Sequence, residues 1–130
     1  EAGQRVEKVE SHQDAATAPV RLYYTGWSSS TGEADWGLRP LFAGDKTPPS
    51  MYNISYYKNP TVDADIMKAL GTTDRAEKTK LYTEVQEEIW KDAPWAFLVT
   101  EKLLYATSKK LTGMYVMPDA NYFFEEIDLQ

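Results

Sequence analysis

Residues 59–94 read NPTVDADIMKALGTTDRAEKTKLYTEVQEEIWKDAP, and this stretch decides the fold because it predicts two helices with their own start and stop signals. Asn59 and Pro60 start the first helix, since an asparagine side chain accepts hydrogen bonds from free amides and proline supplies a preset φ. Gly71 ends this helix. Apolar side chains predict one buried face on it, at Val62, Ile66, Met67 and Leu70.

A second, longer helix is predicted from Asp74 to the residues before Pro94. Glu77 follows Asp74 at the spacing of a capping box, and Pro94 cannot continue a helix. The predicted buried stripe consists of Leu81, Tyr82, Val85, Ile89 and Trp90. The opposite face is charged, which is typical of a solvated helix surface rather than of a metal or catalytic site: Glu84, Glu87, Glu88, Lys91 and Asp92.

Residue types that favour strands flank this helical stretch on both sides. Residues 20–26, VRLYYTG, predict the first strand. Further short strands are expected after the helices, at 95–100, 103–107 and 114–117, with a turn at 109–113. The sheet that these strands would form is expected to be small.

Two more helical elements are expected before the central stretch. Residues 3–10 predict a weakly amphipathic helix, and Asp35 is expected to cap a short helical turn over residues 36–42. The fold class is therefore α/β or α+β, with two helices covering a small sheet. A length of 130 residues favours a single domain, 1–130.

Composition excludes several classes of function. Fourteen Lys and Arg against twenty Asp and Glu leave a net charge of −6, which repels nucleic-acid phosphates. The absence of cysteine excludes disulfides, thiol nucleophiles and thiolate metal sites, and His12 has no second imidazole with which to hold a metal. No apolar run approaches the length of a membrane span. We therefore expect no metal, no cofactor and no nucleic-acid partner.

Residues 24–36, YTGWSSSTGEADW, form the candidate ligand-binding segment. They follow a predicted strand and combine two indole rings with many small hydrogen-bonding groups, which suits a peptide-like ligand. The alternative is a solvent loop whose Trp27 packs into the core, and the residues alone leave both interpretations open. The candidate binding residues are Tyr24, Trp27, Ser28, Ser29, Ser30, Glu33, Asp35 and Trp36.

Glu33 and Asp35 admit more than one role because they are two carboxylates at positions i and i+2. One of them could accept a hydrogen bond from a ligand ammonium. The alternatives are a small hydrolase that uses the pair for acid and base catalysis, or a helix cap at Asp35. A further alternative is a protein-interaction domain that docks a partner through its aromatic surface, since aromatic residues make up 13% of the chain.

A series of motifs in order along the chain carries a family resemblance. The motifs are Gly26-Trp27, Pro40-Leu41-Phe42, Tyr57 to Asp63, Asp74 with Leu81-Tyr82 and Gln86, Asp92-Ala93-Pro94-Trp95, and Lys110 to Gly113. Together they resemble the C-terminal part of the peptide-binding family of ABC-importer solute receptors, which includes dipeptide, oligopeptide and nickel binders. The match covers nearly the whole chain. Within that family, residues 26–36 and 111–119 are most similar to members that bind glutathione.

The resemblance implies a two-lobed receptor of type II-like periplasmic architecture, of which this chain is about the last quarter and most of one lobe. Such a receptor captures glutathione or a related short peptide between its lobes, catalyses no reaction, and works with the membrane permease subunits of an importer. Trp27 matches the family's cleft-lining tryptophan. Ser30 stands where many members carry the aspartate that pairs with the ligand ammonium, which leaves Glu33, Asp35 or the other lobe for that role.

Overall fold

The computed structural model describes residues 2–12, 14–117 and 119–130. Within these residues the elements are α1 (Ala2–Glu10), α2 (Ala34–Phe42), α3 (Pro60–Gly71), α4 (Arg75–Asp92), β1 (Leu111–Thr112), β2 (Tyr115–Val116), β3 (Tyr122–Phe123) and β4 (Asp128–Leu129). The strands form two antiparallel ladders, β1 with β4 and β2 with β3. The mixture of helices and small antiparallel sheets confirms the predicted class.

The two central helices begin where local chemistry predicts. The Asn59 Oδ1 atom accepts from the amides of Thr61, at 2.9 Å, and Val62, at 3.4 Å. The Asp74 Oδ1 atom likewise accepts from the first amides of α4, at 2.7 and 3.0 Å. Helix α4 ends at Asp92 with a left-handed C-cap residue before Pro94. The start of each helix and the end of α4 are therefore set by side chains and backbone close to them in sequence.

The predicted capping box at Asp74 forms in a modified way. The Glu77 carboxylate accepts a hydrogen bond from the Thr72 hydroxyl at 2.9 Å, and that hydroxyl accepts from the Asp74 amide at 3.2 Å. The threonine hydroxyl thus lies between the two groups that a capping box joins directly.

Replacing Asn59 with alanine should lower the free energy of unfolding by about 1 kcal/mol, the usual cost of losing an N-cap. Asn59 caps α3 and also donates from Nδ2 to the Asp92 carboxylate at 2.8 Å, which ties the start of α3 to the end of α4. Urea denaturation of the variant measures the loss. Asn121→Ala is the control, since Asn121 is exposed and, among the described residues, its side chain bonds only Asp119. A comparable loss there would contradict the assignment.

Helices α3 and α4 pack along each other, and α2 contacts both. The main buried cluster consists of Leu41, Phe42, Ala43, Val62, Ile66, Val85 and Ile89. A second cluster contains Ala69, Leu81 and Tyr82. This core is helical, and it positions the segments that precede α2 and follow α4.

Three residues predicted to be buried lie at the surface. Met67 is 63% exposed, Leu70 42% and Trp90 69%, whereas Ala69 is fully buried. The prediction for these side chains was wrong because the contact between α3 and α4 covers only a narrow stripe of each helix. No further element in the described part of the chain covers the remaining apolar side chains.

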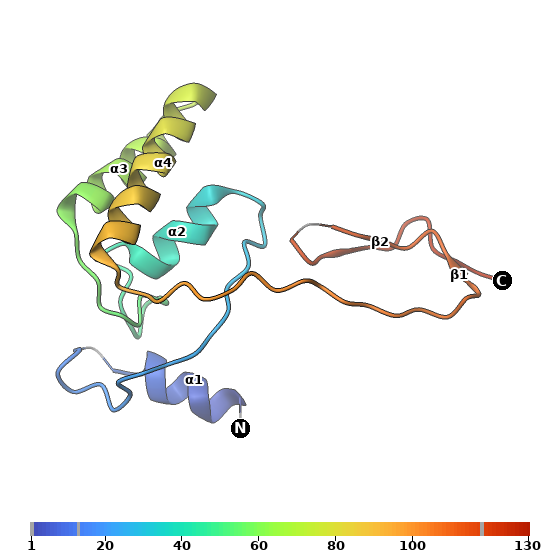
Figure 1. Ribbon diagram of the computed structural model, residues 1–130, viewed down its shortest axis with the longest axis horizontal. Helices are drawn as coiled ribbons and strands as arrows, with labels where there is room; N and C mark the ends of the chain where they lie inside the picture. Colours follow the sequence, from blue (N-terminus) through green and yellow to red (C-terminus); the bar gives the residue numbers. More distant parts are fainter. Residues whose placement is uncertain (1, 13, 118) are drawn as a thin grey trace.

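The expected strands at 20–26, 95–100 and 103–107 do not form, whereas the one at 114–117 is present in part as β2. Strand-forming residue types cannot make a sheet without a neighbouring strand to bond their backbone. The helices also do not cover a sheet as predicted. Figure 1 shows both ladders at the far end of an extended segment, and no helix contacts a strand among the described elements.

Candidate functional site

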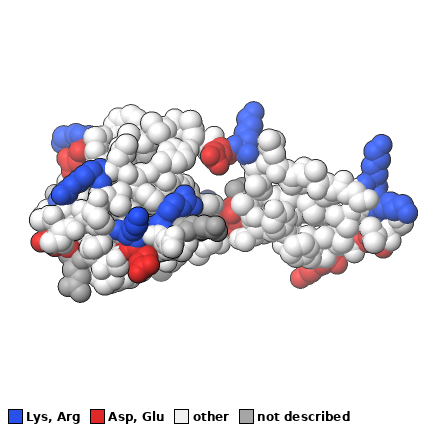
Figure 2. Space-filling model, turned by 90° about the horizontal axis from the view of Figure 1, so that it is seen from below, with Lys and Arg blue, Asp and Glu red and all other residues white. Residues whose placement is uncertain are grey.

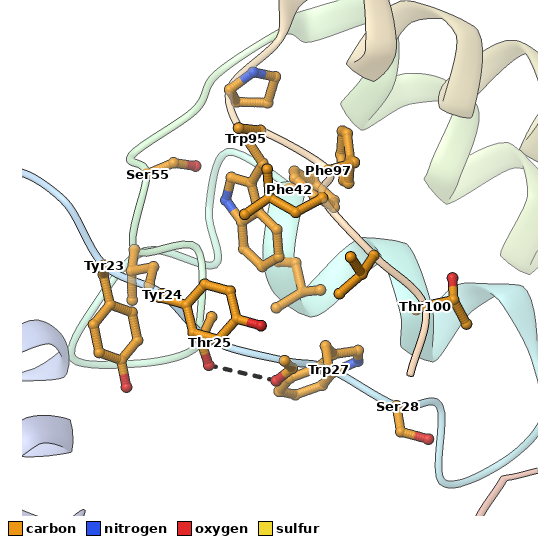
Figure 3. A pocket seen from close by; sticks show the side chains of 18 of the residues that line it. Tyr23, Tyr24, Thr25, Trp27, Ser28, Phe42, Ser55, Trp95, Phe97 and Thr100 are labelled. Carbon is orange, nitrogen blue, oxygen red and sulfur yellow. Dashed lines mark hydrogen bonds between the residues drawn. The ribbon is translucent and has the colours of Figure 1, made fainter. Parts of the chain in front are cut away.

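An open hollow of about 1420 Å³ lies between residues 20–29, helix α2 and residues 94–104 (Figure 3). Four of the predicted binding residues line it: Tyr24, Trp27, Ser28 and Ser29. The other four, Ser30, Glu33, Asp35 and Trp36, do not. The structure therefore brings the first half of the predicted segment to the hollow and leaves the second half beside it.

Trp27 is held in place by its own loop. Its indole Nε1–H donates to the Trp36 carbonyl oxygen at 2.8 Å. Its ring packs against Tyr52, with centroids 5.1 Å apart, and against Trp36, with centroids 5.9 Å apart. Because the polar edge of the indole is already paired, the ring offers its apolar surface to the hollow.

The serine-rich part of the segment is held by hydrogen bonds among its own residues. The Ser29 hydroxyl donates to the Glu33 carbonyl oxygen at 2.9 Å, and the Glu33 amide donates to the Thr31 hydroxyl at 3.2 Å. The Ser28 hydroxyl donates to the Asp119 carbonyl oxygen at 3.4 Å and so bridges to the turn between β2 and β3. Ser30 is exposed and makes no hydrogen bond within the described residues. Pro118, part of the motif at 117–119, lies outside the described residues.

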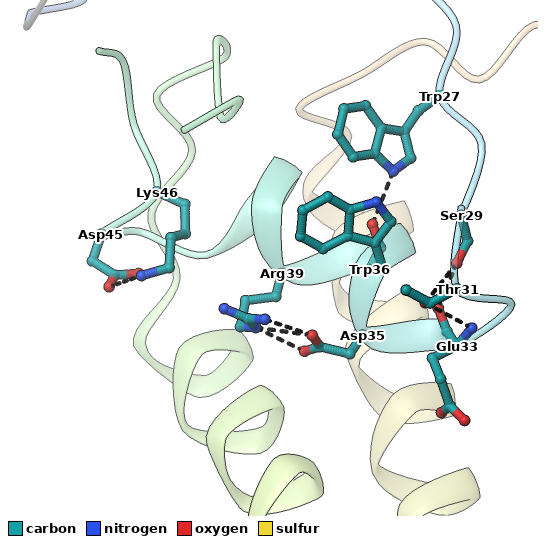
Figure 4. Close-up of polar contacts among 9 residues, drawn as sticks. All are labelled: Trp27, Ser29, Thr31, Glu33, Asp35, Trp36, Arg39, Asp45 and Lys46. Atoms are coloured by element: carbon teal, nitrogen blue, oxygen red, sulfur yellow. Dashed lines mark hydrogen bonds and ion pairs between the residues drawn. The ribbon is translucent and has the colours of Figure 1, made fainter. Parts of the chain in front are cut away.

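The two carboxylates of the segment have different environments (Figure 4). Glu33, not Asp35 as predicted, is the N-cap residue of α2, and its side chain forms no cap bond. Asp35 lies in the first turn and takes hydrogen bonds from the Arg39 guanidinium at 2.7, 2.8 and 3.0 Å. This hydrogen bonding raises the pKa of Arg39. The Glu33 carboxylate has no hydrogen bond or ion pair within the described residues, so it is the one available to a cation.

A polar contact behind the hollow joins the loop before α3 to the end of α4. The Tyr57 hydroxyl donates to the Asp92 carboxylate at 2.6 Å. Burial, together with this hydrogen bond, raises the pKa of Tyr57 to about 12. Hydrogen bonds from Tyr57 and Asn59 lower the pKa of Asp92. The contact fixes the point from which residues 94–104 leave α4 to line the hollow.

The Tyr57 hydroxyl should ionise near pH 12 rather than near the ordinary tyrosine pKa of 10. The measurement is a pH titration of tyrosinate absorbance, in which Tyr57→Phe should lack the rise near pH 12 that the unmodified chain shows. Because its pKa is raised on folding, its contribution to stability is complete below pH 10 and is lost as the pH rises through about 12. Tyr105→Phe, an exposed tyrosine, is the control. The assignment would be contradicted if Tyr105→Phe lost the absorbance rise near pH 12, or if Tyr57→Phe kept it.

Aromatic residues that the sequence analysis did not assign to the site also line the hollow. Phe42, Trp95 and Phe97 meet there, with ring centroids 5.0 Å apart for Phe42 and Trp95 and 6.3 Å for Phe42 and Phe97. The feature of the sequence that pointed to such a lining was its high aromatic content. Which rings meet depends on where α4 ends and how the following segment leaves it, and the residue pattern alone does not specify this.

Charge is distributed without a dominant patch on the face shown in Figure 2, where acidic and basic side chains are interspersed among uncharged ones. Within the described residues, no three His, Cys, Asp or Glu side chains lie close enough together to hold a metal ion. None of the described helices has the length and apolar character needed to cross a lipid bilayer.

Comparison with known proteins finds that this chain is similar along its length to part of the glutathione-binding proteins. The chain is 58% identical over 129 residues to glutathione-binding protein GsiB of Pectobacterium atrosepticum, which covers 99% of this chain and 25% of the relative. It is 51% identical over 130 residues to the proteins of the same name from Salmonella typhimurium and Escherichia coli K12. No family model matches. The similarity confirms the resemblance predicted from the motifs, and the chain spans about a quarter of the length of these relatives.

Proposed function

We propose, from the premise that this chain is similar throughout to part of the glutathione-binding proteins, that it is part of the solute-binding component of an ABC importer. Residues 1–130 form one domain that supplies most of one lobe of a longer receptor. The receptor works in the periplasm of a Gram-negative cell and passes glutathione or a related short peptide to membrane permease subunits. The observation that carries the proposal is the similarity to the glutathione-binding relatives, which runs along this whole chain and covers 25% of their length.

The geometry of residues 24–36 supports the binding role. Trp27 presents an apolar ring surface to the hollow, with Tyr24 and the hydroxyl-bearing residues Ser28 and Ser29 beside it. A peptide fits such a wall, since its backbone needs hydrogen-bond partners and its apolar atoms need a flat surface. Glutathione carries one ammonium group, and we assign its contact to Glu33, whose carboxylate has no partner among the described residues. Glu33 lies beside the hollow rather than in its lining, so this contact requires the ligand to extend past the Trp27 wall.

The arrangement is less suited to the hydrolase alternative. That alternative needs both Glu33 and Asp35 as an acid and base pair. The Arg39 guanidinium already donates three hydrogen bonds to the Asp35 carboxylate, so this ion pair stabilises α2. Asp35 and Trp36 then act indirectly, because their contacts with Arg39 and Trp27 hold the segment that carries Trp27 and Glu33. Ser30, which makes no hydrogen bond within the described residues, stays a candidate for direct contact with the ligand.

A grafted receptor tests the function directly. In it, this chain replaces the matching 130 residues of the Escherichia coli K12 relative. Calorimetry should show glutathione binding within about tenfold of that relative's affinity, and assays on peptide and glycoside panels should show no turnover. The isolated chain should give no measurable binding heat, because half of the enclosing surface is absent. Tight binding by the isolated chain, or none by the grafted receptor, contradicts the proposal.

Glu33→Gln in the grafted receptor should lower glutathione affinity about five- to tenfold, since the substitution removes a charge from an exposed ammonium contact. Glutamine keeps the size of the side chain, so the comparison isolates charge. Glu125→Gln is the matched control, because Glu125 is also exposed but lies between β3 and β4 and does not line the hollow. Equal effects in the two variants would assign the change to long-range charge rather than to contact.

A further inference from the structure

Trp27 has a ring contact that comes from outside its own segment. Tyr52 belongs to the loop between α2 and α3, and its ring centroid lies 5.1 Å from that of Trp27, with the ring planes tilted by 50°. Tyr52 is not among the described residues that line the hollow. Any effect of Tyr52 on a ligand in the hollow is therefore exerted through Trp27.

The hydrogen bond of the indole leaves it one rotation that the ring contacts restrict. The Trp27 Nε1–H donates to the Trp36 carbonyl oxygen at 2.8 Å, which holds one edge of the ring. A single hydrogen bond still allows the ring to turn about the line between donor and acceptor. Aromatic pairs prefer a limited set of tilted or offset geometries, so the contact with Tyr52 opposes this rotation.

Tyr52 is itself held in a fixed place relative to α2. Its amide donates to the Pro40 carbonyl oxygen at 3.2 Å. The next residue, Asn53, is fully buried, and both ends of its side-chain amide are hydrogen-bonded. Pro40 and Trp36 both belong to α2, so the same helix fixes the acceptor of the Trp27 indole and the backbone of its ring partner.

The ring of Tyr52, rather than its hydroxyl, makes the contact. The hydroxyl forms no hydrogen bond within the described residues, and the residue as a whole is 36% exposed. Phenylalanine at this position would therefore keep the interaction with Trp27, whereas alanine would remove it. This difference allows a conservative variant to separate the ring contact from the polar group.

We propose that Tyr52 is a positioning residue for ligand binding, which holds the Trp27 indole at the angle where its ring surface faces the hollow. This inference rests on the proposed function, in which Trp27 forms part of the ligand wall. A side chain that is already ordered before the ligand arrives loses less conformational freedom on binding. Tyr52 therefore raises the affinity for a ligand that it does not contact.

A double-mutant cycle in the grafted receptor tests the proposal by calorimetry with glutathione. Tyr52→Ala should lower the affinity about three- to tenfold, the range expected for one aromatic pair. In a receptor that already carries Trp27→Ala, the same substitution should change the affinity by no more than about twofold, because the group it acts through is gone. Unchanged affinity in Tyr52→Ala, or equal losses in both backgrounds, overturns the proposal.

Two variants serve as controls for the cycle. Tyr52→Phe should keep the affinity within about twofold, since it removes only a hydroxyl that has no partner among the described residues. Tyr115→Ala removes a tyrosine ring that is 59% exposed and does not line the hollow, so it should leave the affinity unchanged. A loss in Tyr115→Ala as large as that in Tyr52→Ala, or a loss of the same size in Tyr52→Phe, also contradicts the positioning role.

Near-ultraviolet circular dichroism gives a second measurement that needs no ligand. This signal depends on fixed packing of aromatic side chains, so the difference between receptors with and without Trp27→Ala reports the order of that indole. The difference should shrink when both receptors also carry Tyr52→Ala and should persist when both carry Tyr52→Phe. If Tyr52→Ala does not fold, Tyr52→Leu replaces it in both measurements, because leucine keeps apolar bulk without a ring.

The two measurements together separate the positioning role from the proposed function. An undiminished difference spectrum in the Tyr52→Ala background, in a receptor that binds glutathione, refutes the positioning role alone. A difference spectrum that shrinks as expected, in a grafted receptor that does not bind glutathione before any substitution, refutes the proposed function alone.

Discussion

Trp27→Ala in the grafted receptor should weaken glutathione binding by about 1–3 kcal/mol, which corresponds to about a 5- to 150-fold loss of affinity. The substitution removes the ring surface that faces the hollow. It also removes the Nε1 hydrogen bond to the Trp36 carbonyl and the ring contacts with Tyr52 and Trp36. Calorimetry with glutathione gives the loss of affinity, and thermal unfolding of the same sample shows whether the receptor remains folded.

Two further variants separate the roles of the indole. Trp27→Phe keeps an aromatic surface but loses the donor to Trp36, so it should retain most of the affinity if ring contact with the ligand dominates. Trp36→Phe keeps the backbone carbonyl that accepts from Trp27 and should have a smaller effect than Trp27→Ala. Unchanged affinity in a folded Trp27→Ala receptor would assign Trp27 to the core.

Asn53→Ala should lower the free energy of unfolding by about 3–4 kcal/mol, because it leaves several buried polar groups without partners. Asn53 is 0% exposed. Its Nδ2 donates to the carbonyl oxygens of Ala43, at 3.0 Å, and Tyr57, at 2.8 Å. Its Oδ1 accepts from the Ser55 hydroxyl and the Tyr57 amide. Urea denaturation of wild-type and variant chains measures the loss.

Controls distinguish the Asn53 network from simple loss of volume. Ser55→Ala removes one donor from Asn53 and should cost about 1 kcal/mol. Asn53→Asp keeps the volume but loses both amide donors and buries a charge, so it should destabilise at least as much as alanine. A loss below about 1 kcal/mol for Asn53→Ala would show that this side chain does not hold the loop between α2 and α3 together.

The ends of the helices could be predicted because the residues that form them are neighbours in sequence. Asn59 and Asp74 cap amides two and three positions further along the chain, and Pro94 stops α4 regardless of what surrounds it. The assignment of Val62, Ile66, Val85 and Ile89 to the core was equally direct, because helical periodicity places them on one face.

The candidate site was predictable only in part. The segment 24–36 was identified from its composition, and its first half lines the hollow. The role of Asp35 was not predictable, because helical spacing allowed it to cap α2 or to pair with Arg39, and the choice depended on where the helix begins. The binding roles of all eight candidate residues remain predictions.

By itself, the sequence determined the class, the boundaries of α3 and α4, and the similarity to glutathione-binding proteins, because each depends on short-range chemistry or on ordered motifs. Only the tertiary structure decided that Trp90 and Met67 are exposed and that Trp27 is bonded to Trp36. It also decided that residues 20–26 and 95–107 have no backbone partner among the described residues. These outcomes depend on which surfaces meet across long stretches of chain. A strand in particular needs a neighbour to supply its hydrogen bonds, and no local pattern reveals whether that neighbour is present.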